Sequence, residues 1–198
     1  RNDIYIREVI QLGEKVLDKA LKKANWLPKD LDYIITVSCT GIMIPSLDAY
    51  LINALQLRQD IVRLPVTEMG CAAGISGMIY AKNFLQANPG KRAAVIAVES
   101  PTATFQLDDY SMANIVSAAI FGDGAACVLL SSYEDEQGPE IVAEEMYHFY
   151  DAEQMMGRFE SHSNSAMGFV WLSTPFARDA AAGTTRHAEV LAGRAYLR

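Results

Sequence analysis

Hydrophobic positions along this chain follow two alternating spacings. Between Ile6 and Ala24 the apolar residues fall three and four positions apart, which places them on one face of a helix. Elsewhere, short runs of β-branched and other apolar residues have the composition of strands. We predict helices over residues 6–24, 47–57, 71–86 and 112–121. We predict strands over residues 33–37, 61–66, 93–98, 126–130 and 141–149.

The order of these elements predicts the fold class. Strands alternate with helices from Asn2 to about Ser132, and we expect the apolar strands at 61–66 and 93–98 to be buried. The sequence therefore predicts an α/β fold with a mostly parallel sheet covered by helices. After Gly157 the composition changes to a stretch rich in Ser, Ala, Gly and Thr, and we predict a weakly specified tail over residues 158–198.

Charge and composition argue against several classes of partner. The net charge is -7 and the basic residues are scattered, so we expect no nucleic-acid surface. No apolar run approaches membrane-spanning length, and the first residues do not resemble a signal peptide. The three cysteines, Cys39, Cys71 and Cys127, have neither disulfide nor metal-ligand spacing, which predicts a reducing, cytoplasmic setting.

One cysteine lies where a strand gives way to a helix. Cys71 belongs to the segment VTEMGCAAGISG, in which a β-branched run is followed by small residues. At a helix start, unpaired N–H groups and the helix dipole favour a thiolate, which is the nucleophilic form of cysteine. Free cysteine is also among the most buried residue types. Residue types alone therefore leave two interpretations of Cys71 open, a nucleophile and a core residue.

Four segments, taken together and in this order, carry a resemblance. VSCTGIMIP, VTEMGCAAGISG, AVESPTATF and AIFGDGAACVLLSS resemble the N-terminal half of a type III polyketide synthase of the chalcone synthase-like family. The resemblance covers residues 1–157 and implies the N-terminal half of a thiolase-like fold. Bacterial enzymes that make alkylpyrones or alkylresorcinols are more similar than plant ones, because GCAAG departs from the plant form.

The resemblance implies roles for particular residues. Cys71 matches the nucleophile that accepts a starter acyl group from coenzyme A and carries the growing chain as a thioester. Phe121 matches a gatekeeper between the coenzyme A tunnel and the reaction cavity, and a core aromatic at a helix end is the alternative interpretation. Cys39 and Thr40 match residues that line the cavity, and Cys39 could equally be a packed strand-end residue.

Four further positions complete the implied site. Glu99 and Thr104 match residues beside the cavity, and a carboxylate at the end of a buried strand should be hydrogen-bonded or paired. Pro101 stands where plant chalcone synthases have threonine, which argues against a phenylpropanoid starter. Ile44 matches a position that reaches into the neighbouring subunit's cavity, so the resemblance implies a homodimer.

The implied reaction needs coenzyme A thioesters as substrates and no cofactor or metal. Decarboxylation of malonyl-coenzyme A gives a carbanion, and the resemblance assigns stabilisation of its enolate to a histidine and an asparagine in the C-terminal half. None of the three histidines, His148, His162 and His187, matches that position. We therefore expect no robust condensation from this chain alone. It would then be a fragment, the product of a truncated gene, or a chain whose reading frame changes near residue 157.

Two alternatives remain open from the sequence. A ketoacyl-carrier-protein synthase of the same fold would also use a cysteine at this position. A non-catalytic chain, either inert or pairing with another chain, would explain the absent histidine and asparagine. Loss of half of a paired fold would expose an apolar face, so this second alternative predicts self-association.

Overall fold

The computed structural model describes residues 2–146, 148, 150, 156–160, 167–171 and 194–197, the last three segments as backbone. The α-helices are α1 (Asn2–Ala24), α2 (Leu47–Leu55), α3 (Ala73–Ala87) and α4 (Met112–Ile120). Short 3₁₀ turns are η1 (Pro28–Asp30), η2 (Gly70–Ala72) and η3 (Pro101–Thr104). The strands are β1 (Tyr33–Val37), β2 (Val62–Val66), β3 (Arg92–Glu99), β4 (Gly124–Ser131), β5 (Ile141–Glu145), β6 (Met156–Glu160), β7 (Met167–Trp171) and β8 (Arg194–Leu197).

The main sheet has the strand order β2-β1-β3-β4. β1 is parallel to both of its neighbours, and β4 runs antiparallel to β3. The prediction of an α/β fold with a mostly parallel sheet is confirmed, with β4 as the antiparallel strand. β4 begins at Gly124, opposite Glu99, so the chain returns from the edge at which β3 ends instead of crossing over.

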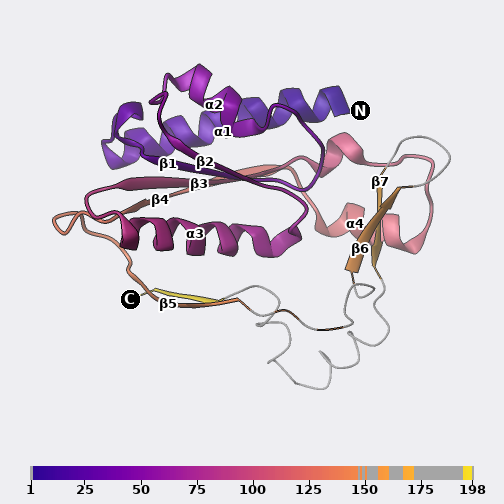
Figure 1. Cartoon of the computed structure of the whole chain (residues 1–198). Helices are drawn as coiled ribbons and strands as arrows, with labels where there is room; N and C mark the ends of the chain where they lie inside the picture. The colour runs from indigo at the N-terminus through magenta and orange to yellow at the C-terminus, as the bar shows by residue number, and fades with distance from the viewer. Residues whose placement is uncertain are drawn as a thin grey trace.

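Helices cover both faces of this sheet (Figure 1). On one face, α1 and α2 bury a core that includes Val9, Leu17, Leu51, Ile34 and Ile96. On the other face, α3 packs on alternate residues of the same strands, so that all five side chains of β1 are buried. This two-sided burial explains why YIITV is a continuous apolar run.

The strand β2 lies at the edge of the four-stranded sheet, which corrects the prediction that it is buried. Val62, Arg63 and Pro65 are exposed, and Val66 alone within the strand is buried. Since proline has no N–H to give to a strand partner, Pro65 suits this edge. An apolar β-branched run does not by itself distinguish a central strand from an edge strand.

The described strands beyond β4 do not join the four-stranded sheet. β5 pairs with β8, and β6 pairs with β7, each in an antiparallel two-stranded ribbon. The strand predicted over residues 141–149 ends at Glu145, and residues 147 and 149 lie outside the described part. The boundary placed near Gly157 stays a prediction.

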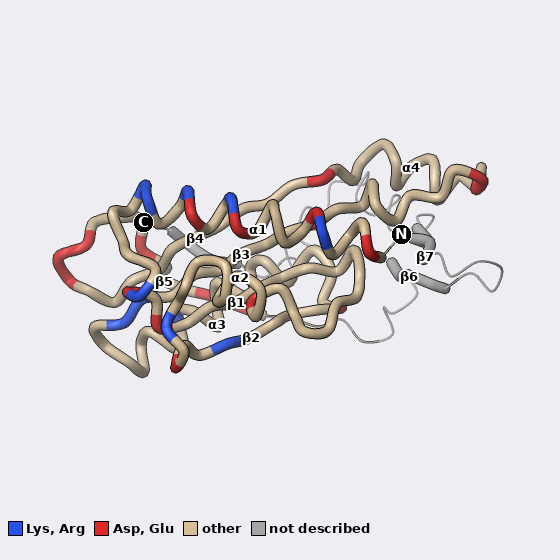
Figure 2. Tube along the Cα trace, turned by 90° about the horizontal axis from the view of Figure 1, so that it is seen from above, with Lys and Arg blue, Asp and Glu red and all other residues tan. Residues whose placement is uncertain are grey.

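Basic and acidic residues are interspersed along the described part of the chain. Figure 2 shows basic and acidic positions alternating along α1, where Lys22 pairs with Asp18 at 2.7 Å. The described helices also include none that is both long enough and apolar enough to cross a lipid bilayer.

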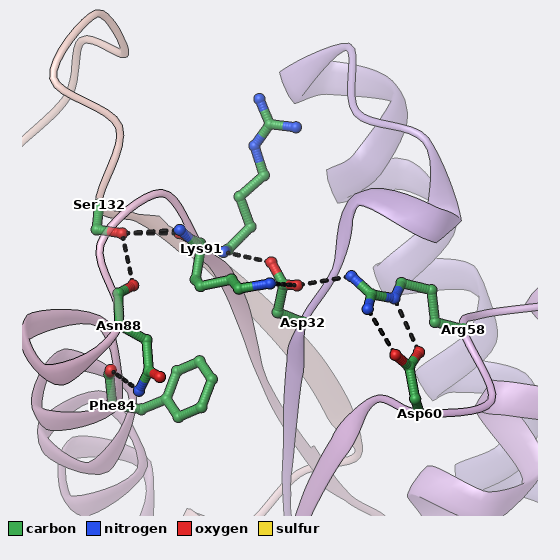
Figure 3. Close-up of polar contacts among 8 residues, drawn as sticks. Asp32, Arg58, Asp60, Phe84, Asn88, Lys91 and Ser132 are labelled. Atoms are coloured by element: carbon green, nitrogen blue, oxygen red, sulfur yellow. Dashed lines mark hydrogen bonds and ion pairs between the residues drawn. The ribbon is translucent and has the colours of Figure 1, made fainter.

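A cluster of ion pairs lies at the end of the sheet where β1, β2 and β3 begin. The carboxylate of Asp32, which precedes β1, accepts hydrogen bonds from Arg58 at 2.7 Å, from Lys91 Nζ at 2.8 Å and from the Arg92 N–H at 3.1 Å (Figure 3). Arg58 also binds Asp60, again at 2.7 Å. These contacts join the starts of β1, β2 and β3, at the end of the sheet opposite to the one where these strands finish.

Arg92 adds a second set of contacts at this edge. Its guanidinium lies 4.7 Å from the ring centre of Trp26 and 4.8 Å from that of Tyr133. It also pairs with Asp30 and with Glu136. Two aromatic rings and two carboxylates therefore surround the side chain of Arg92, which is the first residue of β3.

Candidate active site

The candidate site lies where β1, β2 and β3 end. Val37 is in register with both Val66 and Ala97, so the segments that follow these strands emerge at one edge of the sheet. They carry residues 38–40, 67–71 and 99–101. The predicted residues Cys39, Cys71 and Glu99 are thus brought to the same edge from segments far apart in sequence.

Cys71 lies in η2, which leads directly into α3. The N–H of Ala73 donates to the carbonyl of Gly70, so the 3₁₀ turn and α3 form one continuous helical start. The Cys71 thiol is free and the residue is exposed. An exposed cysteine at a helix start fits the nucleophile interpretation and does not fit the core-residue interpretation.

The turn before Cys71 has an unusual backbone. Glu68 and Gly70 both have φ of 63°, in the left-handed region. Glycine adopts that region freely, whereas a glutamate there is strained, and such strain is common near functional sites. A Cβ on Gly74 would meet no atom within 4 Å, so there is open space beside the first turn of α3. The small residues of GCAAG leave room around the thiol.

Glu99 holds the loop that follows β1. The Cys39 N–H donates to Glu99 Oε1 at 2.9 Å, and the Thr40 hydroxyl donates to Glu99 Oε2. The Ser100 N–H donates in turn to Thr40 Oγ1 at 3.2 Å. Burial raises the pKa of Glu99, while hydrogen bonds from Cys39, Thr40 and Ser38 act in the opposite direction. The prediction that this carboxylate is hydrogen-bonded is confirmed.

The two predicted cavity residues of this loop differ in exposure. Thr40 is buried, and its hydroxyl donates to Glu99 and accepts from the Ser100 N–H. Its side chain therefore helps to hold the loop after β1 against the end of β3. Cys39 is partly buried and its thiol is free of disulfides. A cavity-lining role for either residue stays a prediction.

The remaining predicted residues lie on the segment from η3 to β4. The Thr104 hydroxyl donates to the Pro101 carbonyl at 3.1 Å, within η3. Phe121 caps the C-terminal end of α4 and is partly buried, and its N–H donates to the Ser117 carbonyl at 3.0 Å. Asp123, which the sequence reasoning missed, accepts from the Thr102 N–H at 2.9 Å and so ties the GDG turn to η3.

Ile44 and the histidines lie elsewhere. Ile44, between β1 and α2, is 93% exposed and would be available to a neighbouring subunit. His148 is exposed and follows β5. His162 and His187 lie outside the described residues. Within the described part, no group of three or more His, Cys, Asp or Glu side chains could hold a metal ion.

Residues 1–133 match the family described as chalcone and stilbene synthases, N-terminal domain. That is two thirds of the chain. This chain belongs to the chalcone and stilbene synthase family. The family resemblance predicted from the four sequence segments is thereby confirmed.

Bacterial relatives support the same assignment. The chain is 36% identical to 1,3,6,8-tetrahydroxynaphthalene synthase of Streptomyces coelicolor over 130 residues, which are 66% of this chain and 35% of that enzyme. It is 32% identical to phloroglucinol synthase of Pseudomonas fluorescens over 147 residues, which are 74% of this chain and 42% of that enzyme. The chain spans less than half the length of these curated relatives.

A solved structure confirms the predicted fold. The crystal structure of 1,3,6,8-tetrahydroxynaphthalene synthase from Streptomyces coelicolor, described as a bacterial type III polyketide synthase, superimposes with a TM-score of 0.82 at 28% identity. The match covers 91% of this chain and 51% of that chain. The chain therefore has the thiolase-like fold of type III polyketide synthases, over the part that corresponds to their N-terminal half.

Proposed function

We propose that this chain forms the nucleophile-bearing half of a polyketide-forming acyltransferase. Cys71 accepts a starter acyl group from acyl-coenzyme A, malonyl-coenzyme A supplies the extension units, and the product cyclises to a pyrone or resorcinol. The observation that carries the proposal is the exposed thiol of Cys71 at the start of α3, in a chain of this family.

The loading step follows from the geometry at this position. The Cys71 thiolate attacks the carbonyl carbon of the thioester, a new carbon–sulfur bond forms, and coenzyme A leaves as its thiolate. N–H groups at the start of a helix favour the anionic nucleophile. The open space beside Gly74 supports the approach of a substrate arm.

The condensation step needs donors for the enolate that decarboxylation creates. The resemblance assigns this role to a histidine and an asparagine. We propose that none of the three histidines of this chain takes the place of that catalytic histidine. The chain alone would then load acyl groups without condensing them, since removing such donors lowers the rate by about 10²–10³-fold. We also propose a cytoplasmic location, which is supported by three cysteines that form no disulfide, and a homodimer in which Ile44 reaches its partner.

Intact-mass analysis tests the loading step. Incubation of the chain with a fatty acyl-coenzyme A should add one acyl mass to the wild type and to Cys127→Ala, but none to Cys71→Ala. Cys127→Ala is the matched control because it removes a thiol that packs in the core formed by α1 and α2. Equal adducts on the wild type and Cys71→Ala would reject the proposal.

A second candidate function, a non-catalytic interaction subunit, rests on α4. That helix has no buried residue, and Met112, Ile115 and Ile120 are exposed. Apolar side chains exposed along one helix favour association with another surface. Light scattering decides between the candidates: self-association without Cys71 acylation supports the second, and acylation by a monodisperse chain supports the first.

A further inference from the structure

The first turns of α1 hold the loop that carries Cys39. The side chain of Asn2 binds both polar backbone groups of Ile42: Nδ2 donates to the carbonyl at 2.7 Å, and Oδ1 accepts from the N–H at 3.2 Å. One side chain thereby satisfies the backbone of a loop residue 40 positions away. Such a paired contact fixes both the position and the orientation of the peptide.

Tyr5 holds the same loop one turn further along α1. The residue is 1% exposed, and its hydroxyl shares a hydrogen bond of 2.6 Å with Ser38 Oγ. Its ring lies against Gly41, where an added Cβ would be 2.3 Å from the ring. The loop therefore needs glycine at this position because the ring of Tyr5 fills the space.

Glu99, the last residue of β3, contacts the same loop. It binds the Cys39 N–H and the Thr40 hydroxyl, as described above. Every residue from 38 to 42 thus contacts either α1 or the end of β3. The backbone on both sides of Cys39 is therefore held by contacts with α1 and with Glu99.

We propose that Asn2 and Tyr5 are positioning residues that set the depth of the acyl site by fixing this loop. Neither is a catalytic residue; each acts through Cys39. This inference rests on the proposed function, because it assigns selectivity for acyl length to the site that Cys71 loads. Loosening the loop should let Cys39 move and admit longer acyl groups.

The first test measures the loop directly and does not depend on acylation. Tyr5→Phe removes only the hydroxyl, and Asn2→Ala removes the paired contact. In both, alkylation of Cys39 by iodoacetamide, followed by peptide mass spectrometry, should accelerate about fivefold, because one net hydrogen bond biases local opening by about that factor. Tyr33→Phe, on the opposite face and at the other end of β1, is the matched control and should leave the Cys39 rate unchanged.

The second test measures selectivity. The ratio of long-chain to short-chain acyl-coenzyme A loading on Cys71, by intact mass, should rise in Tyr5→Phe and in Asn2→Ala relative to Tyr33→Phe. Cys39 rates that stay within a factor of two of wild type in both variants overturn the inference, and so does an unchanged loading ratio. If no variant, nor the wild type, loads Cys71, the proposed function fails, and with it the assignment of selectivity, whatever the Cys39 rates show.

Discussion

The backbone N–H of Cys39 donates to the carboxylate of Glu99 at 2.9 Å, across 60 positions of sequence. This bond joins the end of β1 to the end of β3. The same carboxylate also receives the hydroxyl of Thr40, so one side chain determines where the loop after β1 begins. The ionisation of Glu99 should therefore be coupled to the stability of this edge.

Replacing Glu99 should change how stability depends on pH. Burial raises the pKa of Glu99 in the folded protein, so its contribution to the free energy of unfolding is greatest below the ordinary glutamate pKa and is lost as the pH rises through the raised value. Glu99→Gln cannot ionise. Urea unfolding at several pH values should show the stability of wild type falling relative to Glu99→Gln as the pH rises through this window. A wild-type advantage that grows with pH would contradict the raised pKa.

The buried carboxylate of Asp48 should make its partner Arg63 important for stability. Asp48 is 0% exposed and pairs with Arg63, and its Oδ1 has no hydrogen-bond partner in the described structure. Arg63→Ala leaves a buried charge unpaired and should lower the free energy of unfolding by about 3 kcal/mol. Thermal and urea unfolding measure this effect.

A double variant provides the control for that pair. Arg63→Ala combined with Asp48→Asn should recover part of the lost stability, because the neutral amide costs less to bury than an unpaired carboxylate. Additive losses in the double variant would show that the two side chains are not energetically coupled.

Two glycines should respond oppositely to alanine. Gly41→Ala forces a Cβ against the buried ring of Tyr5 and should destabilise the protein by about 1–3 kcal/mol. Gly74→Ala meets open space within α3 and should stabilise it by about 0.5 kcal/mol through helix propensity. Chemical denaturation of the two variants checks both signs, and similar losses for both would mean that the contact with Tyr5 is not the cause.

The three cysteines should differ in reactivity. Burial raises the pKa of Cys127 to about 12, so very little of its reactive thiolate exists near neutral pH, whereas Cys71 is exposed. Alkylation of the folded protein at pH 8 should label Cys71 first and Cys127 last. In denaturant all three should react at similar rates, and an equally fast Cys127 in the folded protein would contradict its burial.

The sequence predicted the elements better than their arrangement. The run YIITV identified β1 because both faces of that strand are buried, and the small residues after Cys71 identified the start of α3. The edge position of β2 and the antiparallel direction of β4 were missed, since both depend on which strands lie alongside. Hydrophobic spacing carries no information about strand order.

The supports of the site were harder to predict than its central residue. Cys71 stood out because its neighbours are small and close in sequence. Asn2 and Tyr5 lay before the start of the first predicted helix at residue 6, and their loop partners Ile42 and Ser38 lie 40 and 33 positions away. Contacts of that range become visible only once the chain is folded.

The ion-pair cluster around Asp32 has a consequence for engineering. It joins the starts of three strands at the end of the sheet away from Cys71, so these contacts do not depend on the segments that surround the thiol (Figure 3). Exposed positions beside Cys71 that make no contact with Tyr5 or Glu99 are therefore the ones at which the surroundings of the thiol could be redesigned without loosening the starts of the strands.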